Sequence, residues 1–257
     1  MYEKVDVIFN KLDIFLQDND IEDYKIPQVV EDFLRKEMKH KRFQLDEKLE
    51  LFYHFTIESQ KHELEKLIKS ETKKLKKEGY FDDMGYFYTI YETRPYMRLR
   101  YAYMRHLSKM GKLSLAVGEA EEIIKLNIND NMGVRYWLMK LYAILENLES
   151  AENLYGRYSD DGSVHFLLPL SILYYKFDQM KKAQKYLELA YQNNNYLIDF
   201  LRGDLDFEDE EIVNCVEHGV YRVGGPGEIA TIALECQDLM FLSGSYVIWA
   251  EEKLNAL

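Results

Sequence analysis

A small residue recurs at near-constant intervals in the middle of the chain. Ala116, Ala151 and Ala183 each follow a short turn between apolar segments, and they lie 35 and 32 residues apart. A period of about 34 residues is typical of helix–turn–helix repeats. A small residue early in the second helix lets the paired helices pack at short distance. This spacing predicts a series of stacked helical hairpins.

The period and the place of the small residue are those of tetratricopeptide repeats. We therefore expect an all-α fold, a tetratricopeptide-like helical-repeat array over residues 86–202. Residues 1–85 are expected to form a helical N-terminal extension, and residues 203–257 C-terminal capping helices. The composition agrees, because 4 Pro and 13 Gly in 257 residues are few turn-formers for a sheet-rich fold.

The N-terminal region has apolar residues at three- and four-residue steps. One of its expected helices runs from about residue 46 to residue 78. The second half of this helix is polar on most sides, and Gly79 is placed to end it. A helix with so few apolar residues at one end protrudes into water or meets another chain. We therefore expect a homodimer through residues 46–78.

The charge of the chain argues against nucleic acid as a partner. It has 33 Lys and Arg residues against 45 Asp and Glu residues, a formal net charge of −12. Binding to nucleic acid depends mainly on neutralising phosphates. Two basic stretches, Arg35–Arg42 and Lys66–Lys77, leave room for a small basic face, although such runs on helices are usually solvated.

Motifs for enzymes, cofactors, metals and membranes are missing from the sequence. It contains no GxSxG, HExxH, Walker A or dinucleotide fingerprint, and Cys215 and Cys236 are not in a CxxC arrangement. The glycine cluster Gly224–Gly227 lacks the Lys-Ser/Thr of a phosphate loop. The longest uncharged runs are shorter than the ~20 residues that span a bilayer. We expect a cytoplasmic, non-enzymatic chain without cofactor or metal.

One segment differs from an ordinary repeat, and it reads YETRPYMRLR over residues 91–100. It concentrates Glu92, Arg94, Arg98 and Arg100 where Pro95 should begin a helix, with Tyr96 beside them. Guanidinium groups near a helix N-terminus can hold a carboxylate or phosphate. The alternative is an internal ion pair between Glu92 and an arginine, joining the N-terminal helices to the array.

Two further clusters lie between expected helices. The first has Asn129, Asp130 and Asn131 followed by Arg135, Tyr136 and Trp137, and the second has Asp160 and Asp161. Helix capping is the alternative explanation for the Asn and Asp residues. Because the arginines and acids are offset by one repeat, stacking would align them in a polar groove for an extended peptide. The candidate partner-binding residues are Glu92, Arg94, Tyr96, Arg98, Asn131, Arg135, Tyr136, Asp160 and Asp161.

The motifs ETRPYMR over residues 92–98 and NDNMGVRY over residues 129–136 also carry a family resemblance. They are similar to the ETRPYMRAR and NDNQGVRY motifs of bacterial tetratricopeptide-repeat proteins related to the suppressor-of-tumorigenicity family. The resemblance covers about residues 80–254, with departures at Leu99 and Met132. It implies a helical scaffold without an established enzyme activity.

The function expected from these observations is binding of a protein or peptide in a repeat groove lined by Arg and Tyr. The alternatives are a peptide-sensing regulatory protein and, less favoured, an enzyme with a site between helices.

Overall fold

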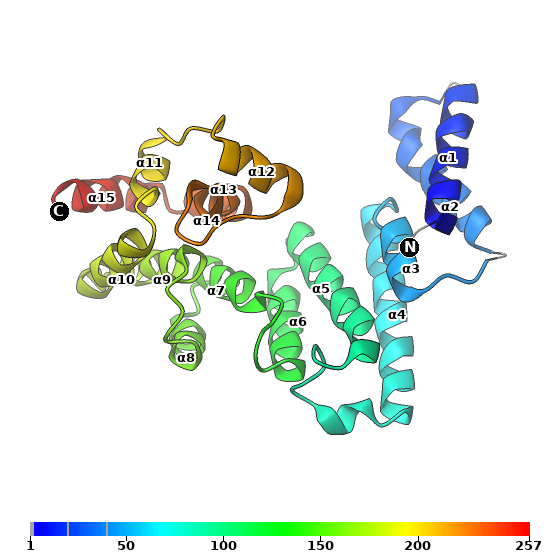
Figure 1. Ribbon diagram of the computed structural model, residues 1–257, viewed down its shortest axis with the longest axis horizontal. Coiled ribbons are helices and arrows are strands. Elements are labelled where there is room, and N and C mark those ends of the chain that lie inside the picture. Colours follow the sequence, from blue (N-terminus) through cyan, green and yellow to red (C-terminus); the bar gives the residue numbers. More distant parts are fainter. Residues whose placement is uncertain (1–2, 20, 40) are drawn as a thin grey trace. The chain divides into compact units, whose positions relative to one another are not determined.

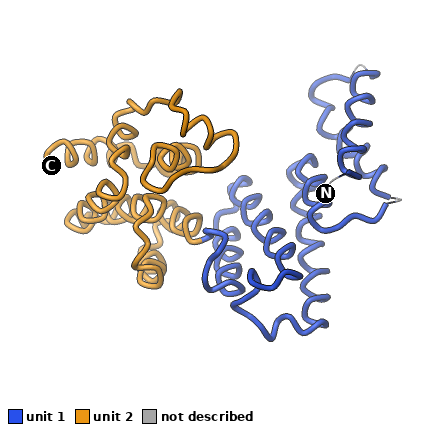
Figure 2. Tube along the Cα trace, viewed as in Figure 1, with its two compact units in different colours: residues 1–134 blue, residues 135–257 orange. Residues whose placement is uncertain are grey.

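The chain is all-α, as the sequence predicts. The computed structural model describes residues 3–19, 21–39 and 41–257, and these contain fifteen α-helices, three short 3-10 helices and no strand (Figure 1). They form two compact units, residues 1–134 and 135–257 (Figure 2). The three-region division expected from the repeats is a different partition of the chain and stays a prediction.

The first unit contains the N-terminal helices and the first repeat pair. Its α-helices are α1 (Glu3–Asp18), α2 (Ile26–Met38), α3 (Leu45–Phe52), α4 (Ile57–Lys77), α5 (Arg94–Lys109) and α6 (Leu113–Leu126). Its 3-10 helices are η1 (Asp23–Lys25), η2 (Tyr80–Asp83) and η3 (Tyr91–Thr93). Gly79 follows α4 with φ 84°, the left-handed conformation that lets glycine end a helix.

The second unit contains the later repeats and the C-terminal helices. Its repeat helices are α7 (Val134–Ile144), which begins at the boundary, α8 (Leu148–Arg157), α9 (Val164–Lys176) and α10 (Met180–Asn193). They are followed by α11 (Leu197–Arg202), α12 (Glu210–His218), α13 (Pro226–Glu235), α14 (Gln237–Phe241) and α15 (Gly244–Asn255).

The expectation of one helix over residues 46–78 is wrong, because the chain breaks between α3 and α4. The turn between these helices buries Phe55, which is 6% exposed. The Glu31 carboxylate on α2 accepts hydrogen bonds from the amide and the hydroxyl of Thr56, at 3.1 and 2.7 Å. These contacts with α2 stabilise the break, although the turn contains neither Gly nor Pro.

The three alanines that define the repeat occupy tightly packed positions. Ala116 on α6, Ala151 on α8 and Ala183 on α10 are each 0% exposed. Helices α5 and α6 pack against each other, as do α9 and α10, and α8, which carries Ala151, packs against α9. The small residues therefore lie where close helix packing requires them, as in a helical-repeat array.

The C-terminal helices cover α9. Every residue of α9 from Val164 to Tyr174 is buried. Helix α13 packs against α9, and α15 packs against α10. The hydroxyl of Tyr246 on α15 donates to Ser171 on α9 at 2.8 Å. The face of α9 that an open array would leave to solvent is therefore occupied by the chain's own helices.

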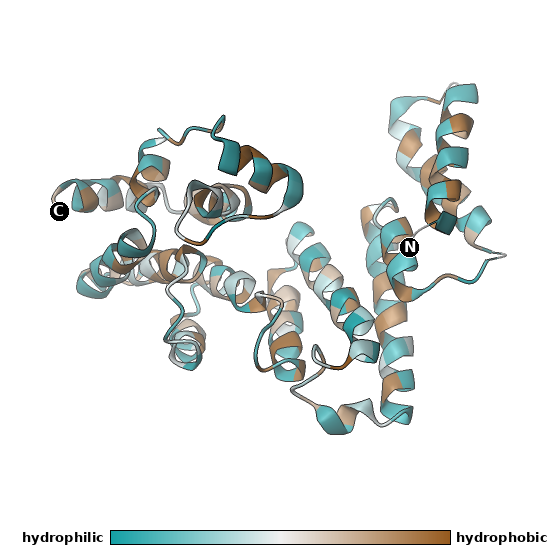
Figure 3. Cartoon of the chain, viewed as in Figure 1, coloured by the Kyte–Doolittle hydropathy of each residue, from teal (hydrophilic) through white to brown (hydrophobic). Residues whose placement is uncertain are grey.

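The longest helix, α4, has 21 residues, and hydrophobic and hydrophilic positions alternate along it (Figure 3). Among the described helices, none is both long enough and apolar enough to cross a membrane. The apolar side chains of Leu64 and Leu75 on α4 are buried within the chain.

The homodimer through residues 46–78 stays a prediction.

Candidate binding site

The N-terminal end of α5 is held by a buried threonine. The short helix η3 leads directly into α5, whose first turn contains Pro95. Thr93 is 0% exposed, and its hydroxyl donates to the carbonyl oxygens of Phe87 and Ile90. Glu92 and Arg94, on either side of Thr93 in the sequence, therefore lie on a fixed turn.

Arg94 lies between two tyrosines at the surface. Its Nε donates to the carbonyl oxygen of Tyr88 at 2.9 Å. Its guanidinium carbon lies 5.5 Å from the ring centroid of Tyr88 and 6.0 Å from that of Tyr91. Tyr91 is 77% exposed, and no described carboxylate forms an ion pair with Arg94. We call Tyr88, Tyr91 and Arg94 the tyrosine–arginine surface.

A pocket of about 320 Å³ lies beside the start of α5, between α3 and α4, and we call it the α5 pocket. Apolar parts of its wall come from Leu75, Pro95 and Tyr96. Its charged lining residues are Asp46 and Lys48 from α3, Glu71 and Lys74 from α4, and Glu92 from η3. The pocket thus presents both signs of charge.

Two charges of the α5 pocket are available to a ligand. Glu71 forms an ion pair with Lys74 at 3.4 Å, and Asp46 is paired with Arg98. Among the described residues, Lys48 and Glu92 have no ion-pair partner. An anionic group facing Lys48 and a cationic group facing Glu92 would complete the ion pairs of this pocket.

Tyr96 belongs mainly to the core. It is 2% exposed, and its hydroxyl shares a hydrogen bond with Thr72 on α4 at 2.7 Å. Arg100 donates to the same hydroxyl at 3.4 Å. Tyr96 therefore shapes the wall of the α5 pocket and joins α5 to α4.

Arg98 is engaged inside the chain. Its Nε and Nη2 donate to the two carboxylate oxygens of Asp46, at 2.8 and 2.7 Å. This is the internal ion pair that the sequence left open as an alternative, with Asp46 of α3 in place of Glu92. It joins an N-terminal helix to the first repeat helix.

Arg100, the last residue of the YETRPYMRLR segment, forms a largely buried ion pair. Its Nε and Nη2 donate to Glu119 on α6, at 2.5 and 2.9 Å. Glu119 lies 19 residues away, and sequence reasoning did not predict this pair. Sequence reasoning also missed Asp46 and Lys48, which come from α3.

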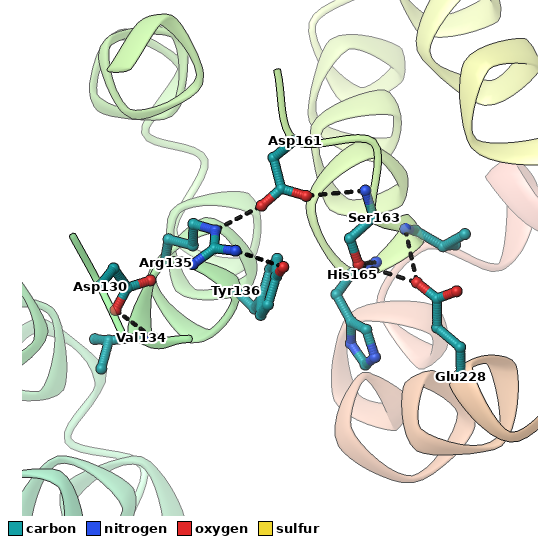
Figure 4. A network of polar contacts seen from close by, with 9 residues as sticks. Asp130, Val134, Arg135, Tyr136, Asp161, Ser163, His165 and Glu228 are labelled. Atoms are coloured by element: carbon teal, nitrogen blue, oxygen red, sulfur yellow. Dashed lines mark hydrogen bonds and ion pairs between the residues drawn. The ribbon is translucent and has the colours of Figure 1, made fainter. Parts of the chain in front are cut away.

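In the second unit, Arg135, Tyr136 and Asp161 come together (Figure 4). One carboxylate oxygen of Asp161 accepts from Arg135 Nε at 2.5 Å, and the other accepts from the Ser163 amide at 2.9 Å. Arg135 Nη2 donates to the Tyr136 hydroxyl at 2.7 Å. The arginine and the acid do lie side by side, as the sequence predicts. They form an ion pair with each other, however, instead of lining a groove for a peptide.

A buried carboxylate extends this network. Glu228, 2% exposed, accepts a hydrogen bond from the Ser163 hydroxyl at 3.0 Å (Figure 4). Its other carboxylate oxygen accepts from the Gly224 amide at 2.8 Å. It also accepts from the Val164 amide at 3.3 Å and the Asn194 side chain at 3.1 Å. This carboxylate accepts from hydrogen-bond donors at the start of α9, and it also fixes the glycine-rich turn before α13.

Two titratable groups beside Glu228 and Asp161 are neutral near pH 7. Burial lowers the pKa of His165 to about 4, and its Nε2 lies 2.8 Å from the hydroxyl of Thr231. Burial also raises the pKa of Tyr136 to about 12. The network of Figure 4 is therefore a set of mutually satisfied groups that fixes the second unit.

The remaining predicted residues lie at the surface. Asn131 and Asp160 are exposed. Asp130, next to Asn131, caps α7 by accepting the Val134 amide at 2.8 Å. Trp137 lies on α7 with the Lys140 ammonium 4.2 Å from its ring centroid.

Residues 3–19, 21–39 and 41–257 contain no group of three or more His, Cys, Asp or Glu side chains arranged to hold a metal ion.

No family model, no curated protein and no solved structure matches this chain. The resemblance to repeat proteins of the suppressor-of-tumorigenicity type stays a prediction.

Proposed function

We propose that this chain is a non-enzymatic, tetratricopeptide-like protein that binds a segment of another protein at the N-terminal end of α5. The observation that supports this most is the environment of Arg94. Among the described residues, its guanidinium has no carboxylate partner and lies beside Tyr88 and the exposed Tyr91, next to a pocket where Glu92 and Lys48 are also unpaired.

The tyrosine–arginine surface suits a carboxylate on the partner. The Nε of Arg94 is used by Tyr88, which leaves its two Nη groups as donors for a forked contact. Tyr and Arg are the residue types that dominate protein interfaces, because they combine apolar area with directional donors. An acidic side chain flanked by apolar residues would meet both parts of this surface.

The α5 pocket suits a neighbouring part of the same segment. A basic side chain would pair with Glu92, and an acidic group would pair with Lys48. The walls belong to helices that are already folded, so binding costs little ordering of the protein. Since the contact area is small, we expect a Kd on the order of micromolar.

The family resemblance supports the same proposal. Tetratricopeptide-like arrays present extended surfaces built from stacked helices, and such surfaces suit protein segments. The covering of α9 by α13 and α15 directs the proposal to the first unit, where the start of α5 is accessible.

A peptide selection tests this proposal. A displayed library of random twelve-residue peptides is selected on the immobilised full chain, and the Kd of enriched peptides is measured by calorimetry. We expect an acidic residue beside an aromatic one in these peptides. Arg94→Gln and Glu92→Gln should each weaken binding about tenfold.

Arg105→Gln is the matched control, because Arg105 also lies over a tyrosine, Tyr101, on the same helix. It should leave the Kd unchanged. Failure to enrich any peptide, or equal affinities for the wild type and Arg94→Gln, would refute the proposed site.

A further inference from the structure

The second half of α4 presents a face of lysines to solvent. At 100° per residue, five exposed lysines of this helix fall within an arc of about 100°. These are Lys66, Lys69, Lys73, Lys76 and Lys77, and we call them the lysine face. No Asp or Glu of residues 66–77 falls within the arc. The buried side chains of Leu64 and Leu75 lie on the opposite side of the helix.

The lysines of this face have no ion-pair partners among the described residues. The nearby carboxylates on α4 form their ion pairs with other lysines, Glu65 with Lys61 at 2.6 Å and Glu71 with Lys74 at 3.4 Å. Lys69 attracts Glu65 electrostatically without forming an ion pair with it. Lys76 lies 5.2 Å from the ring centroid of Phe81, a contact that leaves its charge uncompensated. The lysine face is therefore a positive surface on a chain of net charge −12.

Helix stability explains only part of the lysine face. Lysines in the last turn interact favourably with the helix dipole, which accounts for Lys76 and Lys77. Lys66, Lys69 and Lys73 precede that turn, and of these Lys69 follows Glu65 at a stabilising four-residue spacing. Like charges four residues apart destabilise a helix, and the pairs Lys69–Lys73 and Lys73–Lys77 are so spaced. A partner of opposite charge would relieve this repulsion.

We propose that the lysine face binds an acidic, extended segment of a partner protein. The face is one helix wide and about 16 Å long, which matches about five residues of extended chain. Lys66, Lys69, Lys73 and Lys76 follow one another about 4.5–6 Å apart along the axis, and Lys77 lies about 1.5 Å beyond Lys76. Acidic residues at alternate positions of an extended chain are about 6.7 Å apart and would meet the lysines in turn.

Charge and composition favour a protein segment over a nucleic acid or a membrane. No aromatic residue of α4 lies within the lysine face, and the one contact described with a ring is that of Lys76 with the partly buried Phe81, whereas surfaces for single-stranded nucleic acid use several aromatic rings to stack bases. Glu65 lies about 20° beyond one edge of the arc. A broad polyanion, such as a duplex or an anionic bilayer, would meet this carboxylate, while a single acidic chain fits on the lysines alone.

The proposal is independent of the α5 pocket. That pocket uses Glu71, Lys74 and Leu75, which lie on other sides of α4 from the lysine face. A failure of one site therefore leaves the other unchanged.

The test uses the full chain and a fluorescein-labelled octapeptide of alternating Glu and Ser, with binding followed by fluorescence anisotropy. The quadruple variant Lys66→Gln, Lys69→Gln, Lys73→Gln and Lys77→Gln should weaken binding about tenfold. Gln retains helix propensity and removes the repulsion, so this variant should melt at the wild-type temperature or above.

The matched control changes the net charge equally with four exposed lysines elsewhere, Lys109, Lys125, Lys181 and Lys185, each to Gln. It should weaken binding less than about twofold. Equal weakening in both variants would overturn the proposal, because binding would then follow net charge alone. Stronger binding of an eight-nucleotide oligothymidylate or of phosphatidylserine vesicles, lost in the quadruple variant, would also overturn it.

Discussion

The guanidinium of Arg98 on α5 and the carboxylate of Asp46 on α3 form a two-point ion pair. Its donor–acceptor distances are 2.8 Å for Nε–Oδ1 and 2.7 Å for Nη2–Oδ2, although the residues lie 52 positions apart. Asp46 also lines the α5 pocket. The pair therefore fixes the α3 wall of the pocket against the first helix of the repeats.

A double-mutant cycle on Asp46→Asn and Arg98→Gln should give a coupling energy of about 0.5–1 kcal/mol. The value is small because Arg98 is about half exposed and water screens the pair. Thermal unfolding of the wild type, both single variants and the double variant provides the four values. Strictly additive effects would show that the pair does not hold α3 to α5.

Arg100→Gln should lower the free energy of unfolding of the first unit by about 3 kcal/mol. The substitution leaves Glu119 without its bidentate partner in a largely buried position. Urea unfolding gives the size of the effect, and hydrogen exchange locates it in α5 and α6. Arg105→Gln, at an exposed position of α5, should change stability by less than about 0.5 kcal/mol. Equal effects for the two variants would contradict this role of Arg100.

Ala151→Leu should destabilise the second unit by about 2 kcal/mol. Ala151 is 0% exposed, so the larger side chain displaces its neighbours. The control is Asn153→Leu, at an exposed position of α8. Thermal unfolding followed by circular dichroism distinguishes them. A tolerated Ala151→Leu would mean that the repeat position does not require a small residue.

The stability of the second unit should fall as the pH falls from about 6.5 to about 4. The folded unit keeps His165 neutral, because burial lowers its pKa to about 4. The unfolded chain binds a proton at the ordinary histidine pKa of about 6.5, so acid favours unfolding by about 2 kcal/mol at pH 5. His165→Gln should flatten this part of the profile, measured by urea unfolding between pH 4 and pH 7. An unchanged slope would assign the pH dependence to other groups.

Features set by local sequence were predictable. The spacing of Ala116, Ala151 and Ala183 predicted an all-α repeat fold, and the three residues are buried in it. Gly79 ends α4, and the capping alternative for the Asn129–Asn131 cluster holds for Asp130. Each of these features depends on residues close together in the sequence or on a regular period.

Features set by distant contacts were not predictable. The break before α4 depends on Glu31 of α2, which meets Thr56 only in the folded chain. The partner of Arg98 proved to be Asp46, because folding brings α3 beside α5. The covering of α9 likewise depends on how α13 and α15 pack, which no repeat period encodes.

Of the basic stretch Arg35–Arg42, His40 lies outside the described residues.

Hydrogen–deuterium exchange on the full chain, with and without a peptide selected on it, most directly tests where a partner binds. We predict slower exchange in residues 84–93, which lead into α5, and in residues 43–48 at the α5 pocket. Exchange in residues 135–257 should not change. Protection confined to residues 135–257, or the same protection pattern in Arg94→Gln, would contradict recognition at the N-terminal end of α5.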